Sequence, residues 1–191
     1  LPNTPSVSID NKTSSYEIAK HVISDATQNI LILGLRLEPS NALTMTTFDN
    51  LYSEEECISR RRFEGYKDAM SDIGINLTTQ HIWQIHHLEH DAMKAVLRGA
   101  LTGPKTINVL LCMSDRIALA AIDAAKDLGI QVPEQLKIVG FDGIAQAEKA
   151  GLTTVKQPTT EKGQIAAKIA LALLPYESVQ LSYDILLRET S

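Results

Sequence analysis

The sequence predicts an α/β protein in which helices cover both faces of a parallel β-sheet. Short apolar runs, typical of buried strands, alternate with stretches whose apolar residues recur at helical spacing. The chain of 191 residues is 44% hydrophobic and 21% charged, so it can bury a core in one domain or slightly more. No internal repeat and no glycine-rich phosphate loop interrupts the alternation.

Three strand-and-helix pairs are expected in the first half of the chain. Their strands lie at 7–10, 29–34 and 81–83, and their helices at 13–24, 59–73 and 91–100. The run 29–34 is apolar throughout, as in a strand that is buried on both faces. Gly74 and the pair Gly103-Pro104 suit the ends of the second and third helices. The polar segment 35–57 shows neither the helical nor the strand period of apolar residues, and we expect it to be a long surface loop.

The second half continues the alternation. Strands are expected at 107–113, 137–142, 153–157 and 183–188, and helices at 114–128 and 160–174. Ser114 or Asp115 can cap the first of these helices, and we expect Asp115 to have only this structural role. In parallel sheets of this kind, ligands bind beyond the carboxyl ends of the strands. Residues that follow those ends are therefore the first candidates for a binding site.

Charge and cysteine content restrict the kind of protein. The formal net charge is −5 and the pI is near 5.5, whereas a domain that mainly grips phosphate backbones is usually basic. No stretch approaches the roughly 20 apolar residues of a membrane span, and the first residues do not look like a signal peptide. Cys57 and Cys112 do not indicate a disulfide framework. We therefore expect a cytoplasmic protein without membrane contact.

Four motifs occur in the order and spacing of a known family. They lie at 61–66 (RRFEGY), 112–118 (CMSDRIA), 132–142 (VPEQLKIVGFD) and 152–158 (LTTVKQP). The last two are the most specific, because they occur together and in order. With these motifs, the sequence resembles the LacI/GalR family of transcription regulators from about Val7 to its end.

The resemblance implies a type I periplasmic-binding-protein-like fold, in which the chain crosses three times between two lobes. This sequence would contain mostly the C-terminal lobe, without the helix-turn-helix head or the hinge. Residues 1–10 would end the N-terminal lobe and form the first crossover, and 11–152 would form the C-terminal lobe. Residues 153–176 would return to the N-terminal lobe, and 177–191 would form the final strand of the C-terminal lobe. The returning helix would lack its own sheet and would have to pack on something else, such as a second copy.

Five residues are expected to bind a small effector between the lobes: Arg62, Trp83, Ser114, Asp142 and Gln157. The Arg62 guanidinium can bridge neighbouring hydroxyls, the Asp142 carboxylate accepts from hydroxyl donors, and the Trp83 indole can stack on a sugar ring or a base. Ser114 can donate or accept, and Gln157 lies where the chain returns to the other lobe. Four of them have a plainer alternative: Arg62 on a solvated face, Trp83 in the core, Ser114 capping its helix and Asp142 capping a turn.

The resemblance also implies a function and partners. The chain would be the ligand-sensing domain of a LacI-type repressor, whose effector allosterically controls operator binding by a missing N-terminal domain. The effector is expected to be a sugar or sugar phosphate, and less so a nucleoside or purine. Its identity stays open because positions such as Gly143, where the family often has a second Asp, depart from the pattern. A homodimer is expected, with these residues at its interface: Leu119, Asp123, Gln146 and Lys149. The alternative is a periplasmic sugar-binding protein of an uptake system, which has the same fold.

Metal binding and catalysis are not indicated. His86 and His90 are four residues apart, as metal ligands on a helix are, but no Cys or carboxylate completes a set with ordinary spacing. No nucleophile elbow or metalloprotease signature is present. We therefore expect neither a cofactor nor an enzymatic activity.

Overall fold

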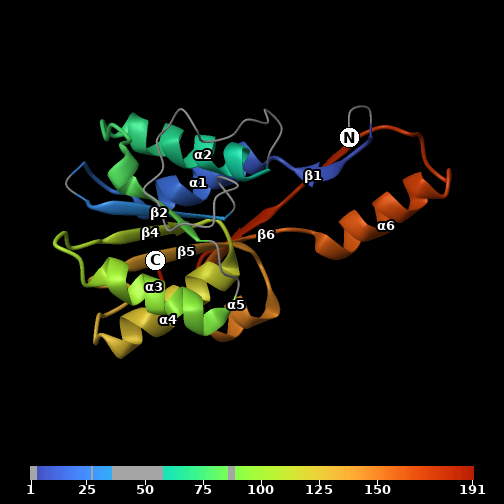
Figure 1. Cartoon of the computed structure of the whole chain (residues 1–191). Helices are drawn as coiled ribbons and strands as arrows, with labels where there is room; N and C mark the ends of the chain where they lie inside the picture. The colour runs from blue at the N-terminus through green and yellow to red at the C-terminus, as the bar shows by residue number, and fades with distance from the viewer. Residues whose placement is uncertain (1–3, 27, 36–57, 86–88) are drawn as a thin grey trace.

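The main structural unit is a six-stranded sheet in the order β3-β2-β4-β5-β6-β8 (Figure 1). The computed structural model describes residues 4–26, 28–35, 58–85 and 89–191. Neighbouring strands pair in parallel except β8, which is antiparallel to β6 at one edge. The predicted, largely parallel sheet is thus confirmed. Its strands are β2 (Ile30–Leu35), β3 (Ile82–Ile85), β4 (Val109–Cys112), β5 (Lys137–Asp142), β6 (Thr153–Lys156) and β8 (Asp184–Leu186).

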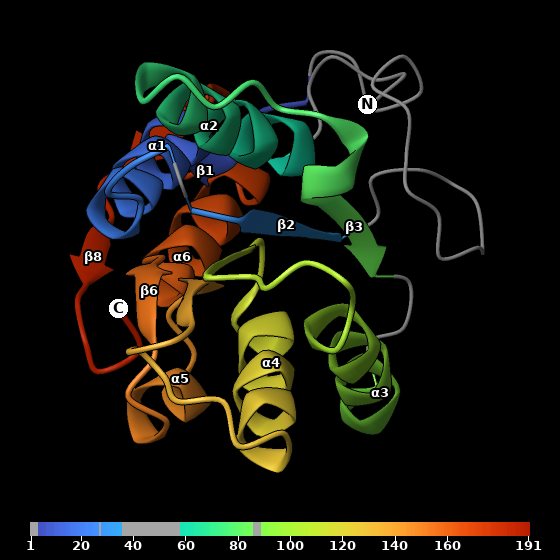
Figure 2. The same ribbon diagram turned by 90° about the vertical axis from the view of Figure 1, so that its left-hand side faces the viewer.

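Helices cover both faces of this sheet, as predicted (Figure 2). On one face lie α1 (Asn11–Val22) and α2 (Ile58–Asp72). On the other lie α3 (His90–Leu101), α4 (Asp115–Asp127) and the short α5 (Ala145–Lys149). A 3-10 turn, Thr79–His81, precedes β3. The sequence did not predict α5, because five residues are too few to show a helical period.

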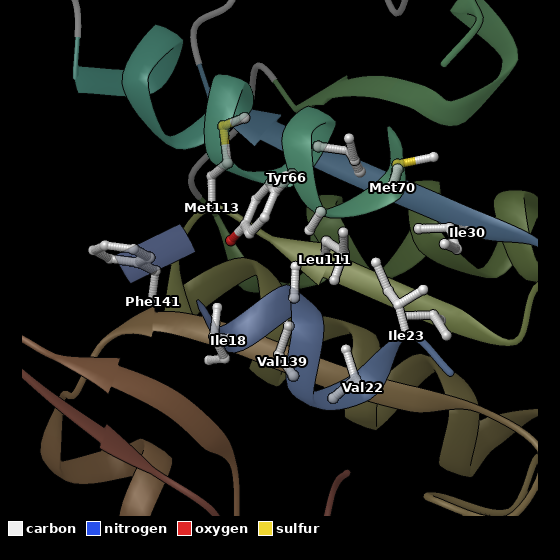
Figure 3. Close-up of a cluster of buried hydrophobic side chains, with 14 of the residues drawn as sticks. Ile18, Val22, Ile23, Ile30, Tyr66, Met70, Leu111, Met113, Val139 and Phe141 are labelled. Carbon is white, nitrogen blue, oxygen red and sulfur yellow. The ribbon is translucent and has the colours of Figure 1, made fainter. Parts of the chain in front are cut away.

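The strands direct alternate side chains into two hydrophobic cores, one on each face. In β2, Ile32 points to the core beneath α1 and α2, whereas Leu33 points to the core beneath α3 and α4. Figure 3 shows the first core, where Tyr66 of α2 lies with Leu111 and Val139 of the sheet. Full burial of a large apolar side chain stabilises the fold by roughly 1.5–3 kcal/mol. The two cores therefore hold the sheet between its helices.

A second, smaller unit lies beyond the end of the large sheet (Figure 1). It consists of a parallel pair, β1 (Val7–Ile9) with β7 (Val179–Leu181), and of α6 (Thr159–Ala170), which contacts β1. The helix expected near 160–174 thus leaves the large sheet. The chain just after α6 exposes large apolar side chains: Leu171, Leu173 and Tyr176.

Two boundaries of the predicted lobe assignment differ from the structure. Residues 153–156, which were assigned to the crossover, form β6 inside the large sheet, where Thr153 and Thr154 are fully buried. Residues 177–191 form two strands, β7 and β8, and not a single final strand. Each has three residues, which is too short for a periodic pattern. The assignment of α6 to a second lobe stays a prediction.

In the ranges that the structure describes, no helix is long and apolar enough to cross a membrane. Cys112 is buried and free, whereas Cys57 lies outside the described residues. The predicted loop 35–57 lies outside them too, apart from Leu35 at the end of β2.

Gly65 lets α1 and α2 approach closely. A Cβ there would collide with the carbonyl oxygen of Lys12 and would lie 2.8 Å from the amide nitrogen of Tyr16. Alanine favours a helix over glycine by about 1 kcal/mol, but here the backbone of α1 leaves no room. We expect Gly65→Ala to lower the free energy of unfolding by about 1–3 kcal/mol in urea titrations.

Gly99→Ala in α3 is the matched control, because a Cβ at Gly99 would meet nothing within 4 Å. This change should raise the free energy of unfolding by up to about 1 kcal/mol. If Gly65→Ala is as stable as the parent chain, the close contact of α1 and α2 does not constrain the fold.

Candidate functional site

Four of the five predicted ligand-binding residues gather at the carboxyl ends of the parallel strands. Ser114 follows β4, Asp142 ends β5 and Gln157 follows β6. Arg62 reaches the same edge from the first turns of α2 and forms an ion pair with Asp142. Because these strands run in parallel, their carboxyl ends meet at one edge, where α/β sheets bind their ligands.

The Arg62 guanidinium is the centre of this group. The residue is 9% exposed, and it donates from Nε to Oδ1 of Asn11 (3.0 Å) and from Nη1 to the carbonyl oxygen of Met113 (2.6 Å). Its Cζ lies 3.6 Å from the centroid of the Phe141 ring, and its Nη2 lies 3.5 Å from Oδ1 of Asp142. A planar cation that is stacked on a ring and bonded along its edges is held in one orientation.

Asp142 connects Arg62 to the segment that leads into α6. Gln157 donates from Nε2 to Oδ1 of Asp142 (2.7 Å), the same oxygen that Arg62 approaches. Lys162, in the first turns of α6, donates in turn to Oε1 of Gln157. The side chain of Asp142 is 34% exposed. Because both neighbours use Oδ1, Oδ2 is the oxygen with which this carboxylate can accept from a ligand.

The backbone at Asp142 has an unusual conformation. Asp142 has φ of 123° and Gly143 has φ of 72°. A Cβ at Gly143 would lie 2.6 Å from Cα of Lys156, so no side chain fits there. A non-glycine residue in such a conformation costs about 1–3 kcal/mol and is found preferentially at functional sites. The turn therefore aims the Asp142 carboxylate at the expense of local strain.

Ser114 has the capping role that was one of its predicted alternatives, whereas Asp115 has a different role from the predicted one. Ser114 caps α4, and its Oγ accepts from the amide of Arg116 (3.1 Å). Asp115 is fully buried and accepts from Oγ1 of Thr154 (2.6 Å) and from the amide of Ile144 (2.8 Å). The predicted capping role of Asp115 is therefore wrong: its side chain points to the sheet and ties β6 and the β5–α5 turn to α4. Ser114 borders the site and stays a candidate ligand contact.

Trp83 is the one predicted residue that the structure does not bring to this group. In the β2–β3 ladder it pairs with Leu33, and it packs on the core beneath α3 and α4. Arg62 belongs to α2, on the opposite face of the sheet. The prediction that Trp83 shares a wall with Arg62 and Asp142 is wrong, because the alternation along β3 turns the indole to the other face.

The residues expected at a dimer interface lie on α4 and α5. Gln146 and Lys149 are exposed, and Leu119 is partly buried against the core. Asp123 contacts His90 of the same chain, with 2.7 Å between Oδ2 and Nε2. Their role in an interface stays a prediction.

The described part of the chain forms no metal site. Between 4 and 191, with the gaps stated above, no three His, Cys, Asp or Glu side chains are grouped to hold a metal ion. His86 and His87 lie outside the described residues, so the structure does not place His86 relative to His90.

Asn11 and Lys162 belong to the site, although the sequence did not indicate them. Asn11 is buried, accepts from Arg62 and donates from Nδ2 to the carbonyl oxygen of Ile9 (3.1 Å), which fixes its amide. Its position directly after a strand was a usable signal. Lys162 gave no signal, because a lysine near the start of a helix is normally solvated.

A profile described as the periplasmic binding protein-like domain matches residues 42–190. The chain belongs to this family. An HTH-type transcriptional regulator of Mycolicibacterium smegmatis is 31% identical over 176 residues, which are 88% of this chain and 48% of that protein. The HTH-type transcriptional regulator DegA of Bacillus subtilis is 33% identical over 164 residues, which are 82% of this chain and 42% of DegA.

A LacI family transcriptional regulator from Corynebacterium glutamicum has a crystal structure similar to this periplasmic binding protein-like domain. The TM-score is 0.87 at 25% identity, over 97% of this chain and 56% of that one. The predicted LacI-type effector-binding region is therefore confirmed, and so is its fold. The chain spans about half the length of the curated relatives that it matches.

The charged groups of this periplasmic binding protein-like domain are poorly solvated. Burial raises the pKa of Asp142 above 3.8, while Arg62 opposes the rise. Burial also lowers the pKa of Arg62, and the charge of Asp142 partly offsets this effect. Burial likewise lowers the pKa of Lys162. A polar ligand that hydrogen-bonds these groups would replace the water they have lost.

The raised pKa of Asp142 makes the stability of the domain depend on pH. Between the unfolded and the folded pKa, the folded chain binds more protons than the unfolded chain, so stability falls as pH rises through this window. Asp142→Asn removes this titration. Relative to that variant, the parent chain should lose free energy of unfolding from about pH 4 upward and level off above the folded pKa.

Urea unfolding at several pH values measures this difference. Asp184→Asn, at an exposed position of β8, is the control for the loss of one carboxylate. A parent chain that gains stability over Asp142→Asn as pH rises would mean that the attraction of Arg62 outweighs burial.

Proposed function

We propose that this chain is the effector-sensing domain of a LacI-type transcriptional repressor, and that its Arg62–Asp142 site binds a small polyhydroxylated molecule, most simply a sugar. The observation that carries the proposal is the pairing of a buried, immobilised guanidinium with a partly exposed carboxylate at the carboxyl ends of the strands. Neighbouring hydroxyls of a sugar donate to a carboxylate and accept from a guanidinium. The relatives named as transcriptional regulators support the regulatory role.

Gln157 and Lys162 provide a path from the ligand to the rest of the protein. Gln157 follows the last parallel strand and bonds both to Asp142 and to Lys162 of α6. A ligand hydroxyl that donates to Oδ2 would move the Asp142 carboxylate, and with it the Gln157 hydrogen bond at Oδ1 that leads to α6. Such a ligand shifts an equilibrium only by its different affinity for the two arrangements. In the proposed mechanism, this shift controls operator binding by a DNA-binding domain outside this sequence.

The partners follow from the same proposal. They are a sugar or sugar phosphate effector, or less favourably a nucleoside or purine, together with operator DNA and a second copy of the chain. The relatives are regulators, so the alternative of a periplasmic uptake protein is not favoured. We likewise propose that the protein is not an enzyme and that it is cytoplasmic.

Calorimetric titration of the chain with ribose, glucose, glucose 6-phosphate and adenosine tests the site. At least one polyhydroxylated compound should bind, and Asp142→Asn, which keeps the shape of the side chain, should weaken it by about tenfold or more. Arg62→Lys should have a similar effect, because lysine cannot bond two hydroxyls side by side. Arg60→Lys, at a surface ion pair with Glu64 on the same helix, is the control and should bind as the parent chain does.

The proposal fails if none of these compounds binds. It also fails if the compound that binds has the same affinity for Asp142→Asn, with an unchanged circular dichroism spectrum, as for the parent chain.

The proposed dimer is tested by reversing one exposed charge on α5. Lys149→Glu should raise the dissociation constant of the dimer in sedimentation velocity, because a charge pair at the rim of an interface becomes repulsive. Lys67→Glu on α2, at the opposite face, is the matched control. A dimer that both variants leave unchanged would remove α5 from the interface.

A further inference from the structure

A second candidate site lies at the end of the sheet opposite to Asp142. It is a cavity of about 480 Å³ between the edge strand β3 and the carboxyl end of α3. The cavity is also lined by the start of β2 and by the residues just before β3 and just before β4. The amino ends of parallel strands lie at the edge opposite to their carboxyl ends, so this cavity is separate from the Arg62–Asp142 site. Its volume is within the range of small-molecule sites.

The inner part of the cavity is apolar and has one flat wall. Leu31 and Ala100 are buried, and they belong to the core on which Trp83 and Ile107 pack. Trp83 is partly exposed here, although it is the only tryptophan of the chain and the sequence placed it at the other site. A partly exposed indole that lines an apolar cavity can stack on the ring of a ligand.

The outer part of the cavity carries hydrogen-bond donors. Lys105 donates from Nζ to Oε1 of Gln80 (2.6 Å), which is a neutral partner. None of the salt bridges within the described ranges involves Lys105. No Asp or Glu is among the described residues that line the cavity. One ammonium charge therefore stands at the opening without a compensating carboxylate.

His81 adds a second donor beside Lys105. The amide of Thr78 donates to Nδ1 of His81 (2.9 Å), so in the neutral ring the hydrogen is on Nε2. Burial lowers the pKa of His81 below 6.5, a backbone hydrogen bond with Thr78 opposes this shift, and the charge of Lys105 adds to it. His81 is therefore a neutral donor at neutral pH, and the cavity offers a single positive charge.

We propose that this cavity binds a small, flat, apolar monocarboxylate, with its ring on Trp83 and its carboxylate at Lys105 and His81. The single ammonium matches one negative charge. A phosphate dianion fits less well, because the cavity is bordered by the carboxyl end of α3, which carries partial negative charge. The site is distinct from the proposed sugar site, and neither depends on the other.

The probe is 3-phenylpropionate, and the emission of Trp83 reports binding without a label because the chain has no other tryptophan. As the probe is added, this emission should change and then reach a plateau. Its neutral isostere, 3-phenylpropionamide, should bind at least about tenfold more weakly, because a charge-assisted hydrogen bond is lost. Lys105→Gln should weaken the acid by a similar factor and leave the amide unchanged. Lys126→Gln, at an exposed position of α4, is the matched control.

Three results would overturn the proposal. The first is that the emission shows no saturable change at millimolar concentrations of the acid, because a dissociation constant above this range corresponds to very weak binding. The second is equal binding of acid and amide, or of the acid by the parent chain and Lys105→Gln. The third is loss of acid binding in Arg62→Lys with retention in Lys105→Gln, which would move the ligand to the other site. Failure of every sugar to bind would not affect this proposal, so the two can fail separately.

Discussion

The fold and the candidate site both depend on the burial of one charged side chain. The Arg62 guanidinium joins α1 through Asn11, the end of β4 through the carbonyl of Met113, and the end of β5 through Phe141 and Asp142. Removal of one partner of a buried charge costs several kcal/mol, because the charge stays behind without compensation. The positions of two strand ends and two helices are thereby tied to one group. That group is also the one that can meet a ligand.

The turn after β5 shows how the sequence accommodates this arrangement. Asp142 has a strained φ, and Gly143 passes so close to Lys156 that a side chain is excluded. The departure from the family pattern at Gly143 thus has a local physical reason. Asp115 stabilises the same turn by accepting a hydrogen bond from the amide of Ile144. Strain in the turn is therefore offset by a partly buried hydrogen bond, which is how such conformations persist.

The sequence predicted the long elements and the strand ends, but not the faces of short strands or long-range contacts. Asp142 and Gln157 were expected together because they lie at the ends of predicted strands, and Arg62 was expected with them because it lies in a motif of the family resemblance. Trp83 was misplaced because β3 has four residues, and a shift of one residue turns every side chain to the other face. The partner of Asp115, Thr154, is 39 residues away. No local pattern predicts such a contact, so the capping role was preferred.

The two ends of the sheet are physically connected, yet they need not be coupled. Trp83 pairs with Leu33, the carbonyl of Leu33 accepts from the amide of Met113, and the carbonyl of Met113 accepts from Arg62. This path runs from the edge strand β3 through the backbone of β2 and of Met113, and it ends at the Arg62 side chain. Coupling between sites requires an element with two arrangements that both ligands bias. α6 packs outside the large sheet, and the hydrogen bonds among the described residues join it to the site through Gln157 and Lys162. A ligand at Asp142 can therefore act on α6, whereas a ligand at Trp83 rests on a part of the fold that does not contact it.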